Sequence, residues 1–180
     1  MKAVLLVVAM AGTARGDSFE FCGKSFDATT KEIECGDHAV TEISVLAHAA
    51  GLEKLYLRMT KVSDLKPLAK LANLRELNLM YTPVVKLEPL AGLALSDLRL
   101  AGTKVTDLSP LAGMTTLEQL DVSDTAVRRV AALAKLDHLD QVDLRSTKVP
   151  MADAKALAKH ARHVYWGENG EGHWGTATGH

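Results

Sequence analysis

The sequence is poor in aromatic side chains, with two Trp, three Tyr and three Phe among 180 residues. A core of this size normally draws on all three aromatic types, so other side chains must fill it. The chain contains 27 leucines and 25 alanines, and a leucine-filled core indicates one small unit repeated many times. The hydrophobic content of 47% excludes a disordered chain, and the length is typical of one domain.

The sequence also lacks an excess of charge of either sign and lacks long apolar runs. Its 21 Lys and Arg residues nearly balance 22 Asp and Glu residues, for a formal net charge of -1. This balance argues against a strong electrostatic footprint for nucleic acid or an anionic membrane. No apolar run approaches the roughly 20 residues that cross a bilayer, so we expect no transmembrane span in the mature chain.

The first fourteen residues have the pattern of a secretory signal. Lys2 precedes an apolar run over residues 3–11, and small residues recur up to Ala14. We therefore predict a signal peptide over residues 1–14, cleaved after Ala11 or Ala14, and a secreted or periplasmic protein. The alternatives are a buried strand and an N-terminal membrane anchor.

Cys22 and Cys35 are the only cysteines, and twelve residues separate them. In an oxidising compartment a disulfide is the default pairing, and a loop of this size contributes about 3 kcal/mol of stability. Two free buried thiols are the alternative for a cytoplasmic protein. A redox pair fits less well because the spacing is not Cys-x-x-Cys.

One pattern recurs from residue 30 to residue 160. The leucines that begin successive full units are separated by 22, 21, 22 and 22 residues: Leu52, Leu74, Leu95, Leu117 and Leu139. A threonine shares one offset in every full unit, and a Pro-Leu pair shares another in three of them: Thr60, Thr82, Thr103, Thr125 and Thr147; Pro67, Pro89 and Pro110. Extending the frame predicts a degenerate first unit from Thr30 and a truncated last one containing Val164 and Trp166.

The unit Leu-x-x-Leu-x-Leu-x-x-Thr-x-Val-x-Asp-Leu-x-Pro-Leu-Ala-x-Leu is almost intact from Leu95 to Met114. It resembles the short leucine-rich repeat of the bacterial internalin and phosphatase-regulator type. The sequence departs from the common repeat in having Thr where many repeats have Asn. In the family that Asn binds backbone groups at the bend that leaves the strand, and a threonine hydroxyl can do part of this.

The repeat predicts an α/β leucine-rich-repeat solenoid with a curved parallel sheet on its concave face. Leu-x-Leu alternation describes a strand with one buried and one wet face, and the Pro-Leu-Ala segment suits a short 3₁₀ or turn return. A single unit cannot bury its leucines alone, so about seven strands should stack. Parallel sheets are normally covered on both sides, but here the residues between the leucines are polar, so one face stays open to a partner.

Both ends of the solenoid need caps. We predict an N-terminal cap over residues 15–29, rich in Phe and tied to Cys35 by Cys22. Pro150 suits a first helical position, and residues 151–161 favour a capping helix on the convex side. The full division is a cap at 15–29, repeats at 30–51, 52–73, 74–94, 95–116, 117–138 and 139–160, a capping strand at 161–167 and a disordered glycine-rich tail at 168–180.

The exposed strand offsets form two columns in which a binding role is expected. The N-terminal half contains Tyr and Arg, residue types that interfaces favour, whereas the C-terminal half is more acidic. Ordinary solvated strand residues are the alternative at each position. The predicted protein-binding residues are Tyr56, Arg58, Asn78, Met80, Tyr81, Arg99, Asp121, Asp143 and Arg145.

The sequence contains no phosphate-cradling glycine loop, nucleophile elbow or zinc motif, and its seven histidines are scattered. Asp121 and Asp143 could pair as carboxylates, but no enclosing pocket is evident. We therefore predict a monomeric protein-binding module without catalysis, cofactor, metal or nucleic acid. The alternatives are a structural or envelope-associated protein without a specific ligand, and weak metal binding through His173 and His180 in the tail.

Overall fold

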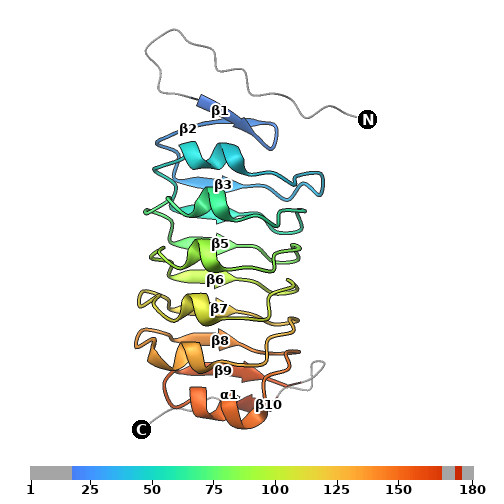
Figure 1. Cartoon of the computed structure of the whole chain (residues 1–180), viewed down its shortest axis with the longest axis vertical. Helices are drawn as coiled ribbons and strands as arrows, with labels where there is room; N and C mark the ends of the chain where they lie inside the picture. The colour runs from blue at the N-terminus through green and yellow to red at the C-terminus, as the bar shows by residue number, and fades with distance from the viewer. Residues whose placement is uncertain (1–17, 168–172, 176–180) are drawn as a thin grey trace.

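The computed structural model describes residues 18–167 and 173–175, and shows an elongated stack of strands with short helical returns (Figure 1). The predicted signal peptide at residues 1–14 lies outside the described residues. Seven parallel strands form the stack, which confirms the predicted leucine-rich-repeat solenoid. They are β3 (Glu32–Glu34), β4 (Lys54–Tyr56), β5 (Glu76–Asn78), β6 (Asp97–Arg99), β7 (Gln119–Asp121), β8 (Gln141–Asp143) and β9 (His163–Trp166).

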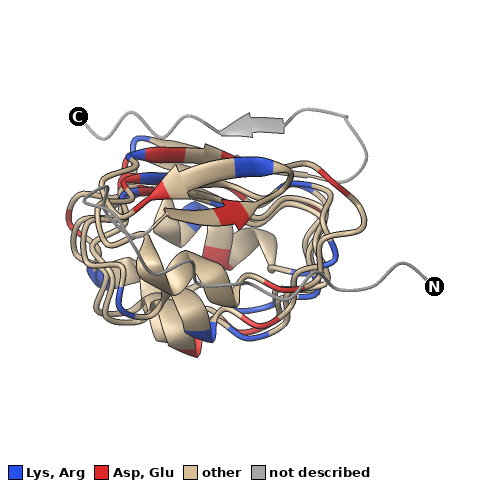
Figure 2. Ribbon diagram, turned by 90° about the horizontal axis from the view of Figure 1, so that it is seen from above, with Lys and Arg blue, Asp and Glu red and all other residues tan. Residues whose placement is uncertain are grey.

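The returns between the strands are five short 3₁₀ helices and one α-helix, on the side opposite the sheet (Figure 2). Proline lies in the first turn of the central three, where its fixed φ suits a tight helical start. The returns are η1 (Ser44–His48), η2 (Lys66–Leu68), η3 (Glu88–Leu90), η4 (Ser109–Leu111), η5 (Ala131–Lys135) and α1 (Met151–Leu157).

The repeat offsets set the register of the sheet. Leu55, Leu77 and Leu98 are direct neighbours on β4, β5 and β6, and each is buried. The leucines between sheet and returns form one continuous core that runs the length of the stack. Because every unit contributes the same inward positions, the core is filled without aromatic side chains in its middle.

Each strand leaves the sheet through the same turn. The residue before the repeated threonine has a left-handed backbone, with φ between +54° and +66° in Met59, Tyr81, Gly102, Asp124 and Ser146. The threonine hydroxyl then donates a hydrogen bond of 2.6–2.8 Å to the carbonyl oxygen three residues earlier in all five units. This bond closes the bend where the wider repeat family carries asparagine.

An antiparallel hairpin of β1 (Ser18–Phe21) and β2 (Lys24–Asp27) lies at the N-terminal end of the stack. Phe19 and Phe21 are buried and join the leucine core, and Phe26 packs against it. The predicted disulfide between Cys22 and Cys35 is present, with a Cα–Cα distance of 6.0 Å. The hairpin is therefore tied covalently to the first unit.

The C-terminal end differs from the sequence expectation in two details. The helix α1 ends at Leu157 rather than at 161, and Pro150 is the residue before the helix rather than its first residue. Because β9 pairs in register with β8 from His163 onward, the chain must leave the helix early enough to cross back to the sheet.

Within the predicted disordered tail, three residues form the strand β10 (His173–Gly175), which pairs antiparallel with β9. Pairing covers the backbone edge that β9 would otherwise leave open. The glycine-rich composition of the tail has no strand alternation and therefore did not predict this strand. Residues 168–172 and 176–180 lie outside the described residues.

Candidate protein-binding face

The structure brings the first predicted column into register across the sheet. Tyr56 pairs with Asn78, Asn78 with Arg99, Arg99 with Asp121, and Asp121 with Asp143. No described helix covers the outer face of these strands (Figure 2). This face is less open than the alternation suggests, however, because Asn78 and Asp143 are buried.

Three members of the column hold the backbone at the end of their own strands. The side-chain oxygen of Asn78 accepts a hydrogen bond from the backbone N–H of Met80 at 3.0 Å. Asp121 and Asp143 accept equivalent bonds, of 2.9 and 3.0 Å, from the N–H groups two residues later. These side chains shape the turn, in the manner of Asx turns, which accounts for their burial.

Tyr56 and Arg99, both predicted to bind a partner, are engaged in bonds along the sheet face. The Tyr56 hydroxyl donates a 2.6 Å hydrogen bond to Glu76, whose other carboxylate oxygen lies 2.7 Å from Lys54 Nζ. The guanidinium of Arg99 binds both carboxylate oxygens of Asp97.

The hydrogen bonds of this network shift the pKa values of Tyr56 and Glu76. The hydrogen bond to Glu76, followed by partial burial, raises the pKa of Tyr56 from 10.0 to about 12. Hydrogen bonds from Lys54 and then Tyr56 lower the pKa of Glu76. The network therefore keeps the Tyr56 hydroxyl protonated and its ring half-buried in place.

In the C-terminal half, Arg145 lies two residues beyond the end of β8 and pairs with Asp143, the last residue of that strand, through its guanidinium and its backbone N–H. The Asp121 carboxylate also accepts a 2.7 Å bond from the hydroxyl of Ser123. The two carboxylates are thus adjacent on β7 and β8 but committed to separate structural bonds. Among the described residues, no three His, Cys, Asp or Glu side chains gather as ligands for a metal ion.

The predicted residues whose side chains form no hydrogen bond or ion pair within the described chain lie on the loop side of the N-terminal half. We define the edge patch as Arg58, Met59, Met80 and Tyr81. Arg58 is exposed, Met59 is 46% exposed and Tyr81 is 56% exposed, whereas Met80 is half-buried. The sequence analysis missed Met59, although Met59 has the same offset before its threonine as Tyr81.

No helix of the described chain is long and apolar enough to cross a membrane.

Comparison with known proteins identifies the fold. No protein-family model and no curated protein matches the chain. Among solved structures, internalin C2 from Listeria monocytogenes is 29% identical with a TM-score of 0.67, over 71% of this chain and 57% of that one. An internalin F from the same organism is 19% identical with a TM-score of 0.71, over 77% of this chain and 43% of its own.

A leucine-rich-repeat protein from Leptospira interrogans has a TM-score of 0.67 at 17% identity, over 73% of this chain and 35% of its own. The matched region thus covers little more than half the length of internalin C2 and less than half the length of the other two proteins. The more distant pair shows the fold alone. Together with internalin C2, these neighbours confirm the leucine-rich-repeat fold of the chain and the similarity of its repeats to those of bacterial internalins.

Proposed function

We propose that the chain is an exported, non-catalytic module that binds a protein partner through the open side of its sheet. One observation carries this proposal. The edge patch presents four large side chains that form no hydrogen bond or ion pair within the described chain, and it lies beside a sheet face that no described helix covers. Arg, Tyr and Met are enriched where proteins meet, because they bury much area at little entropic cost.

Of the nine sequence-predicted residues, the proposal keeps Arg58, Met80 and Tyr81 as contacts and adds the exposed Met59. Asn78, Asp121 and Asp143 are occupied in shaping strand ends, and Tyr56, Arg99 and Arg145 are paired on the sheet. Contact with a partner is therefore assigned to Arg58, Met59, Met80 and Tyr81, with the paired residues forming a polar rim.

The test of this function is affinity capture with the chain as bait. Replacing Arg58 and Tyr81 together by alanine is expected to abolish capture of partners, because both exposed anchors are removed. A matched control replaces Arg128 and Met151, which are equally exposed but lie outside the edge patch. Capture that survives the first pair of changes in a folded protein contradicts the edge patch as the binding surface. No specific capture by the natural chain favours a structural protein without a specific ligand.

Export is the second part of the proposal. Its support is the signal-like sequence of residues 1–14 together with the disulfide between Cys22 and Cys35, since disulfides persist in oxidising compartments. N-terminal sequencing of the protein from its native host is expected to begin at residue 12 or 15. A chain that begins at Met1 contradicts export.

A further inference from the structure

We propose that a groove beside the edge patch docks a short, extended, acidic peptide segment of the partner protein. This inference rests on the proposed protein-binding function and adds the chemistry of the partner. It concerns the loops that leave the sheet, rather than the strands themselves.

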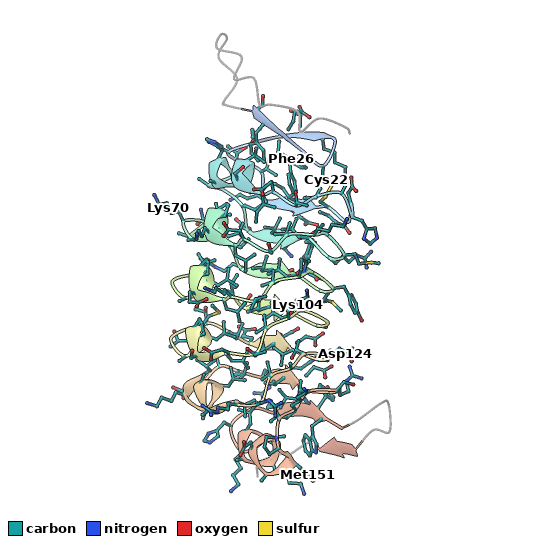
Figure 3. All side chains as sticks on the ribbon, turned by 45° about the vertical axis from the view of Figure 1, so that its right-hand side comes forward. Cys22, Phe26, Lys70, Lys104, Asp124 and Met151 are labelled. Carbon is teal, nitrogen blue, oxygen red and sulfur yellow. A yellow bond between two sulfur atoms is a disulfide. The ribbon has the colours of Figure 1, made fainter. Side chains whose placement is uncertain are left out.

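The groove is a shallow hollow of about 410 Å³ that crosses the loops following β3, β4, β5 and β6. Successive units contribute equivalent positions, so the hollow runs along the stack axis, across the direction of the strands. Met59 and Tyr81 supply its exposed apolar surface. The other side chains that the argument uses are His38, Lys61, Pro83 and Lys104, the last of which is labelled in Figure 3.

The Tyr81 ring packs against Gly102 of the neighbouring unit. A Cβ atom added to Gly102 would lie 2.7 Å from Cε1 of the Tyr81 ring, so a side chain here would require the ring to shift. The left-handed backbone does not by itself require this glycine, since Asp124 and Ser146 adopt the same conformation at the same offset. Gly102 therefore makes room for the Tyr81 ring, which packs over the backbone of the next unit and stays 56% exposed to a ligand.

The charge of the groove is of one sign. None of its nine lining residues is acidic, while two are lysines and one is a histidine. Within the described residues neither Lys61 nor Lys104 forms an ion pair or a side-chain hydrogen bond. A carboxylate oxygen of the nearby Asp37 accepts a hydrogen bond from the backbone N–H of Ala39. In a chain of net charge -1, this is a local basic site with its ammonium groups free.

The spacing of the two lysines fixes the pattern of the ligand. Lys61 and Lys104 share one offset two units apart, and strands stack at about 4.8 Å, so their backbones lie about 10 Å apart. An extended chain rises about 3.3 Å per residue. Alternate side chains of an extended chain point to the same side. Two acidic residues four positions apart, about 13 Å, are therefore within reach of the two flexible lysines, and an apolar residue midway between them faces Tyr81 and Met59.

A peptide fits this groove better than nucleic acid or a membrane surface does. Two lysines neutralise few phosphates, and Tyr81 is the single aromatic residue in the lining, whereas strands of nucleic acid need a row of stacking platforms. A membrane surface attracts larger basic clusters than this one. Exposed Met and Tyr beside charge are typical of peptide-binding surfaces.

The experiment is selection of a random-peptide display library on the full chain. Enriched peptides should carry two acidic residues four positions apart with an apolar residue midway between them. Replacing Lys61 and Lys104 by alanine is expected to weaken their binding by about tenfold or more, and added salt should weaken it further. Tyr81→Ala should weaken binding by a similar factor.

The chain offers a matched control for each change. Lys148 has the offset of Lys61 and Lys104 but lies outside the groove, so Lys148→Ala should leave peptide binding unchanged. Gly102→Ala should weaken binding by displacing the Tyr81 ring, whereas Ser146→Ala, at the same offset but outside the groove, should not. Circular dichroism checks that each variant stays folded.

Three results overturn the inference: no enrichment of acidic peptides, selected peptides that bind the double-lysine variant equally well, or tighter lysine-dependent binding to single-stranded DNA or phosphatidylserine vesicles. The outcome is separable from that of the capture test. If Arg58 and Tyr81 are needed for partner capture while Lys61 and Lys104 are not, the protein-binding function stands and the acidic-peptide inference fails.

Discussion

The repeated threonine forms the same side-chain hydrogen bond in every full unit. The threonine is buried in most units, and its hydroxyl donates a hydrogen bond to the carbonyl oxygen three residues earlier, at the bend that leaves the strand. The resemblance to the leucine-rich repeat implied this partial replacement of asparagine at the shared offset. The roles of Asn78, Asp121 and Asp143 could not be predicted in that way, because the alternation says only that a side chain leaves the core, not that it folds back on its own backbone.

Thr103→Val is expected to lower the free energy of unfolding by about 1 kcal/mol, because it deletes the 2.7 Å bond to the Leu100 carbonyl while keeping the volume of the side chain. Urea denaturation measures the change. Thr106→Val is the control, since Thr106 is exposed and its hydroxyl forms no hydrogen bond within the described chain. Equal stability of both variants contradicts the structural role of the hydroxyl.

Tyr56 provides a titration that reports on the sheet face. Its hydrogen bond to Glu76 raises the pKa to about 12 from 10.0. The neutral phenol is thus favoured in the folded state, so the stabilisation is complete below pH 10.0 and is lost as the pH rises toward 12. Ultraviolet difference spectra against Tyr56→Phe isolate this residue, and Glu76→Gln should return the pKa toward 10.0. An unchanged pKa in Glu76→Gln contradicts the assigned cause.

At the scale of elements, the sequence predicted the strands and their register best, because each is fixed by a pattern repeated at a constant interval. The ends lack that redundancy. The length of α1 depends on where β9 must begin pairing, and β10 exists only because β9 presents a free edge. The edge patch falls between these cases. The sequence predicted Tyr81, whereas Met59 is identified only by the exposure of its side chain in the structure.

The disulfide supplies a test of the N-terminal hairpin. Replacing Cys22 by Ser and Cys35, which is buried, by Ala should lower the free energy of unfolding by about 3 kcal/mol. Thermal unfolding with and without reductant measures this. Reductant should destabilise the natural chain and leave the double variant unchanged. If reductant has no effect on the natural chain, the disulfide does not contribute to stability.

At the scale of the whole molecule, contacts between elements join neighbouring units: each parallel strand contacts the next, and each 3₁₀ return contacts the following one. Stability should then approximate a sum over units and the interfaces between them. An internal unit is in this sense dispensable, provided that a whole period is removed and the register survives.

Deleting residues 117–138, one full unit, should therefore leave a folded stack in which β6 pairs with β8. Unfolding should remain cooperative at a lower midpoint, because one interface is lost. The groove residues lie before the deletion, so peptide binding should persist. Deleting only residues 117–127 breaks the period and should abolish folding. Circular dichroism and urea denaturation distinguish the two. Equal behaviour of both deletions contradicts a modular stack.

The direction of the strands has a mechanical consequence. They run across the long axis of the stack, so the ladder hydrogen bonds lie along that axis, with the N-terminal hairpin and α1 at opposite ends (Figure 1). A load that pulls these ends apart strains the ladders one after another instead of shearing them together. The Cys22–Cys35 link ties the first unit to its hairpin, so detachment should begin at the other end. Under tension the molecule should lengthen in steps of one repeat, each releasing 21 or 22 residues of chain.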